Sequence, residues 1–231
     1  MPYVFAPPPQ PVVPVIGTSD LFPIHRVYCV GRNYAEHARE MGFSGREPPF
    51  FFAKPADAVI PVPEGSVIGI PYPGETHDFH HEIELVVAIG RRGRTLSPQD
   101  AAASVWGYAV GLDMTRRDLQ GDAKKNGRPW ETGKAFDASA PLSPIRRAPA
   151  GAPLAAGRIW LSVNGTLRQE GDLAQLTWNV GETIEHLSRY FELAPGDLIF
   201  TGTPAGVAAV VRGDRLDGGI DGVGRIALRI D

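Results

Sequence analysis

A single apolar run with two acidic residues at its entrance constrains the fold and chemistry of this chain more than any other stretch. Six of the seven residues from Ile83 to Ile89 are apolar and Gly90 ends the run, which predicts a largely buried β-strand. Glu82 and Glu84 interrupt it. Side chains two residues apart on a strand point to the same face, so we expect both carboxylates to project into one small volume.

Two carboxylates held this close repel each other, and one of them stays protonated unless a cation lies between them. Mg²⁺, Mn²⁺ and Ca²⁺ supply such a cation because they prefer oxygen ligands. Asp113 adds a third carboxylate at the end of a second apolar run, residues 106–112. Three such ligands leave about three octahedral positions for water or substrate, as a catalytic metal requires. The alternative for Glu82 and Glu84 alone is a pair of ordinary ion pairs at a sheet edge.

Composition narrows the range of partners. The 231 residues are 43% hydrophobic and 21% charged, which is typical of a globular protein. A net charge of -3 and the absence of a long basic run argue against nucleic acid. Cys29 is the single cysteine, so an intramolecular disulfide and a multi-thiolate zinc site are excluded. No segment is long and apolar enough to span a bilayer, and we expect a cytoplasmic protein that does not contact a membrane.

The order of predicted elements favours one mixed, β-rich domain. Residues 1–23 are rich in proline and form an expected extended N-terminal arm, while residues 24–231 show no repeat and no linker. The runs predicted as further strands are residues 27–30, 50–54, 198–204 and 226–230, with a hairpin centred on Asn164-Gly165. The predicted helices are short and cover residues 98–103, 181–192 and a segment that Asn33 caps and Gly42 ends. Residues 115–137 are predicted as a charged segment and a loop.

Four further side chains have a chemistry that could serve a metal site. Lys54 and Lys134 are single basic residues in apolar or small surroundings, although each could equally form a structural salt bridge. His37 and Glu40 are three residues apart on the helix predicted after Asn33, so they share a face. The alternative for this pair is a solvated helix face.

Several motifs, taken in chain order, resemble the fumarylacetoacetate hydrolase family. They are Val30-Gly31-Arg32-Asn33-Tyr34 with His37 and Glu40, Phe51-Phe52-Ala53-Lys54-Pro55, His81-Glu82-Ile83-Glu84-Leu85, Leu112-Asp113-Met114-Thr115, Gly133-Lys134 and Thr201-Gly202-Thr203-Pro204. The resemblance runs from about Val27 to the C-terminus. It implies an α+β, β-rich fold, a mixed β-sandwich roll with a few short helices, assembled as a homodimer.

The resemblance also implies roles for individual residues. One Mg²⁺ or Mn²⁺ per chain would be bound by Glu82, Glu84 and Asp113. His37 would activate water, Glu40 would orient His37 on a segment that closes over substrate, and Lys134 would stabilise the developing negative charge. The residues implied to line the substrate site are Lys54, Arg117, Gln120 and Thr203.

Within the family the sequence is most similar to members that hydrolyse the carbon–carbon bond of 2,4-dioxo acids. We therefore expect metal-dependent hydrolysis of fumarylpyruvate to fumarate and pyruvate, a reaction of aromatic-compound catabolism. Arg117 is assigned to the distal carboxylate of this substrate because a guanidinium binds a carboxylate bidentately. The alternatives are a general acylpyruvate hydrolase, an oxaloacetate decarboxylase and a non-catalytic metal-binding scaffold.

Overall fold

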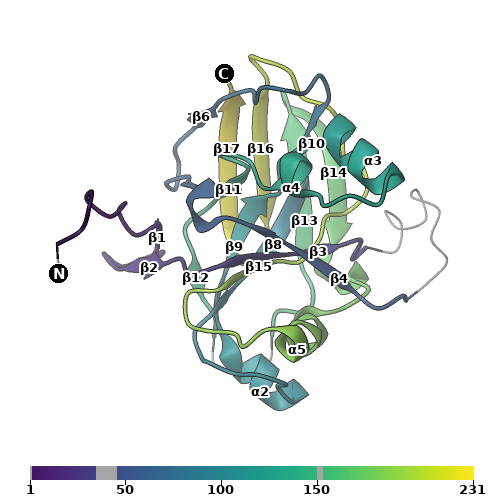
Figure 1. The fold of residues 1–231 in the computed structure, drawn as a ribbon. Coiled ribbons are helices and arrows are strands. Elements are labelled where there is room, and N and C mark those ends of the chain that lie inside the picture. The colour runs from purple at the N-terminus through teal and green to yellow at the C-terminus, as the bar shows by residue number, and fades with distance from the viewer. Residues whose placement is uncertain (1, 35–45, 150–152) are drawn as a thin grey trace.

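The structure, a computed structural model, describes residues 2–34, 46–149 and 153–231, and its centre is an eight-stranded sheet (Figure 1). The strands of this larger sheet are β3 (Val27–Gly31), β4 (Phe50–Lys54), β5 (Val59–Pro61), β8 (Ile83–Ile89), β9 (Val105–Leu112), β11 (Ala140–Leu142), β12 (Arg146–Arg147) and β15 (Leu198–Phe200). Their order is β4-β3-β15-β8-β9-β11-β5, with β12 paired to β9. The acidic strand β8 therefore lies in the middle of the sheet.

A five-stranded sheet packs against the larger one. Its strands are β6 (Ile68–Ile70), β13 (Arg158–Val163), β14 (Thr166–Asp172), β16 (Arg215–Ile220) and β17 (Gly224–Ile230), in the order β14-β13-β16-β17-β6. Two small antiparallel pairs join β1 (Val12–Pro14) to β2 (Leu21–Pro23) and β7 (Phe79–His80) to β10 (Thr115–Arg116). The helices are short: α2 (Pro98–Ser104), α3 (Arg117–Lys125), α4 (Glu131–Lys134), α5 (Val180–Tyr190) and the 3₁₀ turns η1 (Ala56–Ala58) and η2 (Leu173–Gln175).

Six of the seven residues of strand β8 are apolar because both of its faces are covered. Its odd-numbered residues, such as Leu85 and Val87, join the core shared with β13 and β17 of the smaller sheet. Its even-numbered residues, such as Val86, join a second core on the opposite face. Glu84 has the parity of Val86, so its carboxylate is directed to this second face.

The predicted β-rich α+β class is confirmed, and the run from Ile83 to Ile89 is the strand that its composition indicates. Within the residues predicted as an extended arm, Val12–Pro14 form the strand β1. Hydrophobic side chains between residues 12 and 24, such as Val13 and Phe22, are buried in the second core. The division into an arm and a catalytic domain at residue 24 stays a prediction. Among the described residues, no helix has the length and hydropathy required to cross a membrane.

The loop predicted for residues 131–137 was wrong at its start, because α4 occupies Glu131–Lys134, and the charged segment before it contains α3, for which no helix was predicted. The buried side chains of α3 are Gln120 and Ala123. The buried face of α3 therefore carries an amide and a methyl group instead of large apolar side chains. Without apolar residues at helical spacing, the sequence pattern does not indicate this helix. The helix predicted between Asn33 and Gly42 falls on residues 35–45, outside the described residues.

Candidate active site

The three acidic residues singled out from the sequence lie together at one end of β8 and β9. These strands pair antiparallel with Ile83 opposite Leu112, which brings the start of β8 to the end of β9. The backbone N–H of Asp113 donates to the carbonyl oxygen of Glu82 at 2.9 Å and locks this junction. Glu82, Glu84 and Asp113 are buried, and each offers one carboxylate oxygen within 4.8 Å of the others.

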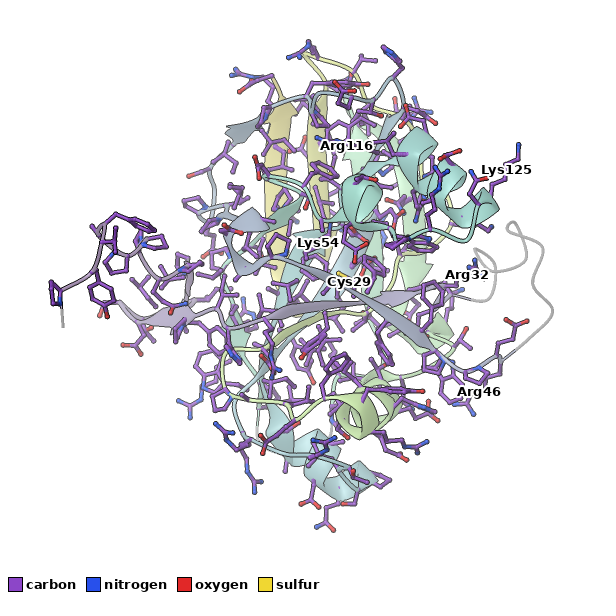
Figure 2. The ribbon with its side chains drawn as sticks, in the orientation of Figure 1. Cys29, Arg32, Arg46, Lys54, Arg116 and Lys125 are labelled. Atoms are coloured by element: carbon purple, nitrogen blue, oxygen red, sulfur yellow. The ribbon has the colours of Figure 1, made fainter. Side chains whose placement is uncertain are left out.

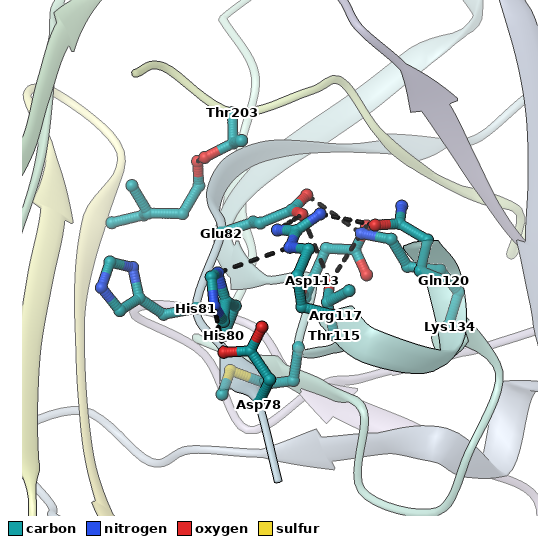
Figure 3. Close-up of polar contacts among 12 residues, drawn as sticks. Asp78, His80, His81, Glu82, Asp113, Thr115, Arg117, Gln120, Lys134 and Thr203 are labelled. Atoms are coloured by element: carbon teal, nitrogen blue, oxygen red, sulfur yellow. Dashed lines mark hydrogen bonds and ion pairs between the residues drawn. The ribbon is translucent and has the colours of Figure 1, made fainter. Parts of the chain in front are cut away.

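Three cationic side chains lie against this cluster, and Figure 3 shows two of them, Lys134 and Arg117. Lys134 Nζ lies 2.7 Å from Asp113 Oδ2 and 3.0 Å from Glu82 Oε2. Lys54 Nζ lies 2.8 Å from the other Asp113 oxygen, and Figure 2 shows Lys54 near Cys29 in the middle of the molecule. Arg117 Nη2 lies 2.5 Å from Glu82 Oε1. The structure thus brings Lys54, Lys134 and Arg117 to the predicted carboxylates.

Glu84 is the exception, since none of the ion pairs formed within the described ranges includes it. Its Oε2 accepts a hydrogen bond from the backbone N–H of Gly202 at 2.7 Å. Burial, and after it the charges of Asp113 and Glu82, raise the pKa of Glu84 well above its ordinary value. A carboxyl group that is protonated for this reason ionises when a divalent cation arrives. Three carboxylate oxygens around one buried volume fit Mg²⁺ or Mn²⁺.

Lys134 remains charged despite its burial. Burial lowers its pKa, but the carboxylates of Asp113 and Glu82 outweigh that effect, so the pKa of Lys134 is raised. Its ammonium group also donates to Thr115 Oγ1 at 2.7 Å. An ammonium group has three protons, and here Asp113, Glu82 and Thr115 all lie within reach of them.

Arg117 fixes the orientation of its neighbours. Its Nη1 donates to Gln120 Oε1 at 2.6 Å, and because a guanidinium cannot accept, the Gln120 amide must turn its Nε2 donors elsewhere. Arg117 Nε donates to His80 Nδ1 at 3.4 Å, and His80 Nε2 lies 2.7 Å from Asp78 Oδ1. Burial, and then the charge of Arg117, lower the pKa of His80. A neutral His80 with its proton on Nε2 satisfies both contacts.

One cavity contains most of the predicted site residues. Its lining is Val30, Gly31, Arg32, Phe52, Glu82, Glu84, Asp113, Arg117, Gln120, Trp130, Lys134, Gly202 and Thr203. Sequence reasoning did not single out Gly202, Thr115, His80 or Trp130 as site residues. The glycine in Thr201-Gly202-Thr203-Pro204 is a signal that could have found Gly202, since its backbone φ is +99° and its N–H binds Glu84. His37 and Glu40 lie outside the described residues.

Arg32 stands out in this lining because its backbone is left-handed, with φ at 61°. Such a conformation is unusual for a residue with a side chain and is concentrated at functional sites. The Arg32 guanidinium lies over the Phe50 ring at 5.3 Å from its centroid. Phe50 in turn packs edge-on against Trp130 at 5.2 Å. One side of the cavity is therefore a cation on an aromatic surface.

Comparisons with known proteins agree with this geometry. The family model described as fumarylacetoacetate (FAA) hydrolase C-terminal matches residues 26–231. A crystal structure of fumarylpyruvate hydrolase from Pseudomonas aeruginosa in complex with Mn²⁺ and pyruvate is 55% identical, covers 99% of each chain and superposes with a TM-score of 0.97. A fumarylpyruvate hydrolase from Ralstonia sp is 44% identical over 80% of this chain and 93% of its own length. The mitochondrial oxaloacetate tautomerase FAHD1 of Rattus norvegicus is 42% identical over 89% of this chain and 91% of its own length.

Proposed function

Since this chain belongs to the fumarylacetoacetate hydrolase family, as its motifs indicate, we propose that it is a metal-dependent enzyme that hydrolyses a 2,4-dioxo acid. The substrate proposed is fumarylpyruvate, and the products are fumarate and pyruvate. The observation that carries this proposal is the buried Glu82, Glu84 and Asp113 cluster in a chain 55% identical to a fumarylpyruvate hydrolase solved with Mn²⁺ and pyruvate.

Glu82, Glu84 and Asp113 would hold one Mg²⁺ or Mn²⁺. When bound, this ion would act as a Lewis acid on the carboxylate and 2-oxo group of the substrate. Within the described structure no cationic side chain forms an ion pair with the carboxyl group of Glu84. When this group ionises, it therefore needs the positive charge that a metal ion would bring. No thiolate or imidazole is required for this donor set.

The charges of the site favour a ligand with two negative charges. Three carboxylates face three cations, Lys54, Lys134 and Arg117, so a divalent ion leaves two positive charges in excess. The enolate of a 2-oxo acid, counted with its carboxylate, supplies the two negative charges. Uncompensated charge in a buried site is costly, and this balance therefore favours chemistry that passes through an enolate.

Hydrolysis also needs water to be activated and an oxyanion to be stabilised. We propose that His37 takes the proton from water, that Glu40 orients His37, and that the water attacks the C4 carbonyl. Collapse of the resulting oxyanion would break the C3–C4 bond and release fumarate and the enolate of pyruvate, which takes up a proton to give pyruvate. Lys134 is held as a cation by Asp113 and Glu82, so its charge is available to the oxyanion. The oxyanion would have to replace one of the three acceptors now around Lys134 Nζ.

The distal carboxylate of fumarylpyruvate needs a cation of its own. Arg117 lies 2.5 Å from Glu82, so its guanidinium is next to the metal ligands rather than at the far end of an extended substrate. This geometry favours a change from the assignment made from sequence. We propose Arg32, on its aromatic surface of Phe50 and Trp130, for the distal carboxylate. Arg117, Gln120, Lys54 and Thr203 would then surround the reacting end.

The hydroxyl of Thr203 can contribute to this site only as an acceptor. Its hydroxyl donates to the carbonyl oxygen of Ile83 at 2.7 Å and accepts from Gln169 Nε2 at 2.8 Å. One lone pair remains. A carboxylate offers no proton to it, whereas an enol or a water molecule does.

A second candidate is interconversion of the keto and enol forms of oxaloacetate, because relatives with this activity in their names are 40–42% identical to the chain. This reaction uses the same enolate chemistry without attack by water. One experiment separates the two. The purified protein is assayed with fumarylpyruvate, acetylpyruvate and oxaloacetate, with Mn²⁺ and with a chelator. Faster turnover of oxaloacetate would replace the proposed substrate, and turnover unaffected by the chelator would refute the metal.

The proposal includes an assembly and a setting. The family resemblance supports a homodimer that acts in aromatic-compound catabolism. The composition and net charge of the chain support a cytoplasmic protein that binds no nucleic acid. The family model begins at residue 26, close to the proposed start of the catalytic domain at residue 24. Light scattering on the purified protein measures the mass of the assembly, and a monomer would contradict the dimer.

A further inference from the structure

A buried amide from the smaller sheet reaches the strand that carries the acidic residues. Gln169 lies in β14, whose other residues are exposed or partly exposed, and its side chain is 0% exposed. Neither its sequence neighbours nor its residue type indicates a role, because Arg168 and Glu170 beside it are exposed. A buried amide needs partners for all of its polar atoms.

Gln169 has these partners, and their chemistry fixes its orientation. Its Oε1 accepts from the backbone N–H of Ile83 at 3.1 Å, and its Nε2 donates to the carbonyl oxygen of Pro204 at 2.9 Å. An N–H can only donate and a carbonyl can only accept, so the amide cannot be reversed. Oε1 also accepts from His81 Nδ1 at 2.7 Å, and Nε2 donates to Thr203 Oγ1 at 2.8 Å.

These four hydrogen bonds join the two segments that place the carboxylates. His81 and Ile83 are the residues on either side of Glu82, at the entrance of β8. Thr203 follows Gly202, whose N–H binds the Glu84 carboxyl. Thr203 Oγ1 completes the connection by donating to the carbonyl oxygen of Ile83 at 2.7 Å. One side chain from the opposite sheet thus joins the residues on either side of Glu82 to the segment whose Gly202 N–H binds Glu84.

We propose that Gln169 is a positioning residue for the metal ligands Glu82 and Glu84. It acts through His81, Ile83 and Thr203 and does not line the cavity itself. The inference rests on the proposed function in that the acidic cluster is taken as a metal site. Groups that orient metal ligands in this way are worth 10–100-fold in metal affinity, to order of magnitude.

Two variants test this role. Gln169→Glu keeps the size and the acceptors for Ile83 and His81 but puts an oxygen against the Pro204 carbonyl. Gln169→Leu removes all four hydrogen bonds. The probe is Mn²⁺ alone, titrated into the full-length protein by calorimetry, with the melting temperature of the metal-free protein measured beside it. We expect Mn²⁺ affinity to fall by about 10-fold or more in both variants.

Matched controls separate positioning from general destabilisation. Ser104→Ala removes a buried hydrogen bond to the Ala101 carbonyl at the end of α2, and should lower the melting temperature without a change in Mn²⁺ affinity. Gln99→Glu makes the same charge change at an exposed position and should alter neither. If Gln169→Leu does not fold, Gln169→Glu carries the test.

The outcomes are distinct. Variants of Gln169 that melt early but bind Mn²⁺ as tightly as the unmodified protein would overturn the positioning role and leave Gln169 a structural residue. An unmodified protein that binds no Mn²⁺ would instead refute the metal site, and the proposed function with it. Weaker Mn²⁺ binding in Gln169→Glu, with Ser104→Ala unaffected, supports the proposal.

Discussion

Lys134 Nζ lies 2.7 Å from Asp113 Oδ2, and the two side chains are only 2% and 1% exposed. Such a buried pair contributes little net stability when intact, because both groups lose their hydration. Removal of one member of such a pair lowers the free energy of unfolding when the remaining charge is left uncompensated. The geometry indicates that Lys134 holds the acidic cluster together before any metal binds, in addition to its proposed role toward the oxyanion.

Lys134→Met should therefore destabilise the metal-free protein. Removal of one partner of a buried ion pair costs about 3–5 kcal/mol; because Lys54 still pairs with Asp113 and Arg117 with Glu82, the loss here should lie at or below the lower end of that range. Urea denaturation in the presence of a chelator measures the loss. Mn²⁺ should narrow the difference between variant and unmodified protein, because it supplies the missing positive charge. The control is Arg189→Met, which breaks an exposed pair with Glu185 and should cost about 0.5 kcal/mol or less. Equal losses in the two variants would contradict this role.

The raised pKa of Glu84 predicts a pH dependence of the metal-free protein. Its ordinary value is 4.5, and in the folded chain burial and two neighbouring carboxylates raise it well above that value. Above pH 4.5 the unfolded chain loses this proton while the folded chain retains it, so stability falls as pH rises toward the folded pKa. Glu84→Gln cannot ionise and should flatten this slope. Denaturation curves between pH 5 and 8, with a chelator present, measure the difference, and identical slopes would show that Glu84 is ionised without metal.

The same carboxyl group predicts proton release on metal binding. Ionisation of Glu84 must accompany coordination, so Mn²⁺ affinity should rise with pH until the folded pKa of Glu84 is reached. Calorimetric titrations in two buffers of different ionisation enthalpy count the protons released. Glu84→Gln should bind Mn²⁺ weakly and release none. Binding with no proton release in the unmodified protein would argue that Glu84 does not coordinate.

Substitutions of Arg32 and of Arg117 should impair the turnover of different sets of substrates. Arg32→Leu should raise KM for fumarylpyruvate by about 10-fold or more, the scale of a lost charged hydrogen bond, and should leave acetylpyruvate, which has no distal carboxylate, unchanged. Arg117→Leu should slow both substrates, because Arg117 pairs with Glu82 and orients Gln120. Steady-state kinetics on the two substrates provide the comparison. The reverse result, with only Arg117→Leu selective for fumarylpyruvate, would restore the assignment made from the sequence.

His37→Ala should separate the two candidate reactions. A general base contributes on the order of 10²–10⁴-fold to turnover, so hydrolysis of fumarylpyruvate should fall by at least about 10². Tautomerisation or decarboxylation of oxaloacetate needs no activated water and should lose less. Stopped-flow assays on both substrates give the two ratios. Equal losses in the two reactions would exclude a role for His37 as the base that acts on water.

The sequence by itself determined the acidic strand and much of the cavity. Strand alternation places Glu82 and Glu84 on one face, and the otherwise apolar run predicts the burial that makes their repulsion chemically significant. Both inferences depend on residues adjacent in the chain. Asp113 and Lys134, singled out by their residue types, and Gln120, which the resemblance added, line the same cavity in the structure.

Only the tertiary structure decided the connections that cross the chain. The amide of Gln169 meets Ile83 from 86 positions away, and Lys134 meets Asp113 across 21. The helix α3 turns Gln120 and Ala123 inward and so leaves no apolar stripe to read. Arg117 is set beside Glu82 rather than at the far end of the site. Local periodicity reports which face of an element is buried, whereas the partner that a buried polar group meets depends on how distant elements pack.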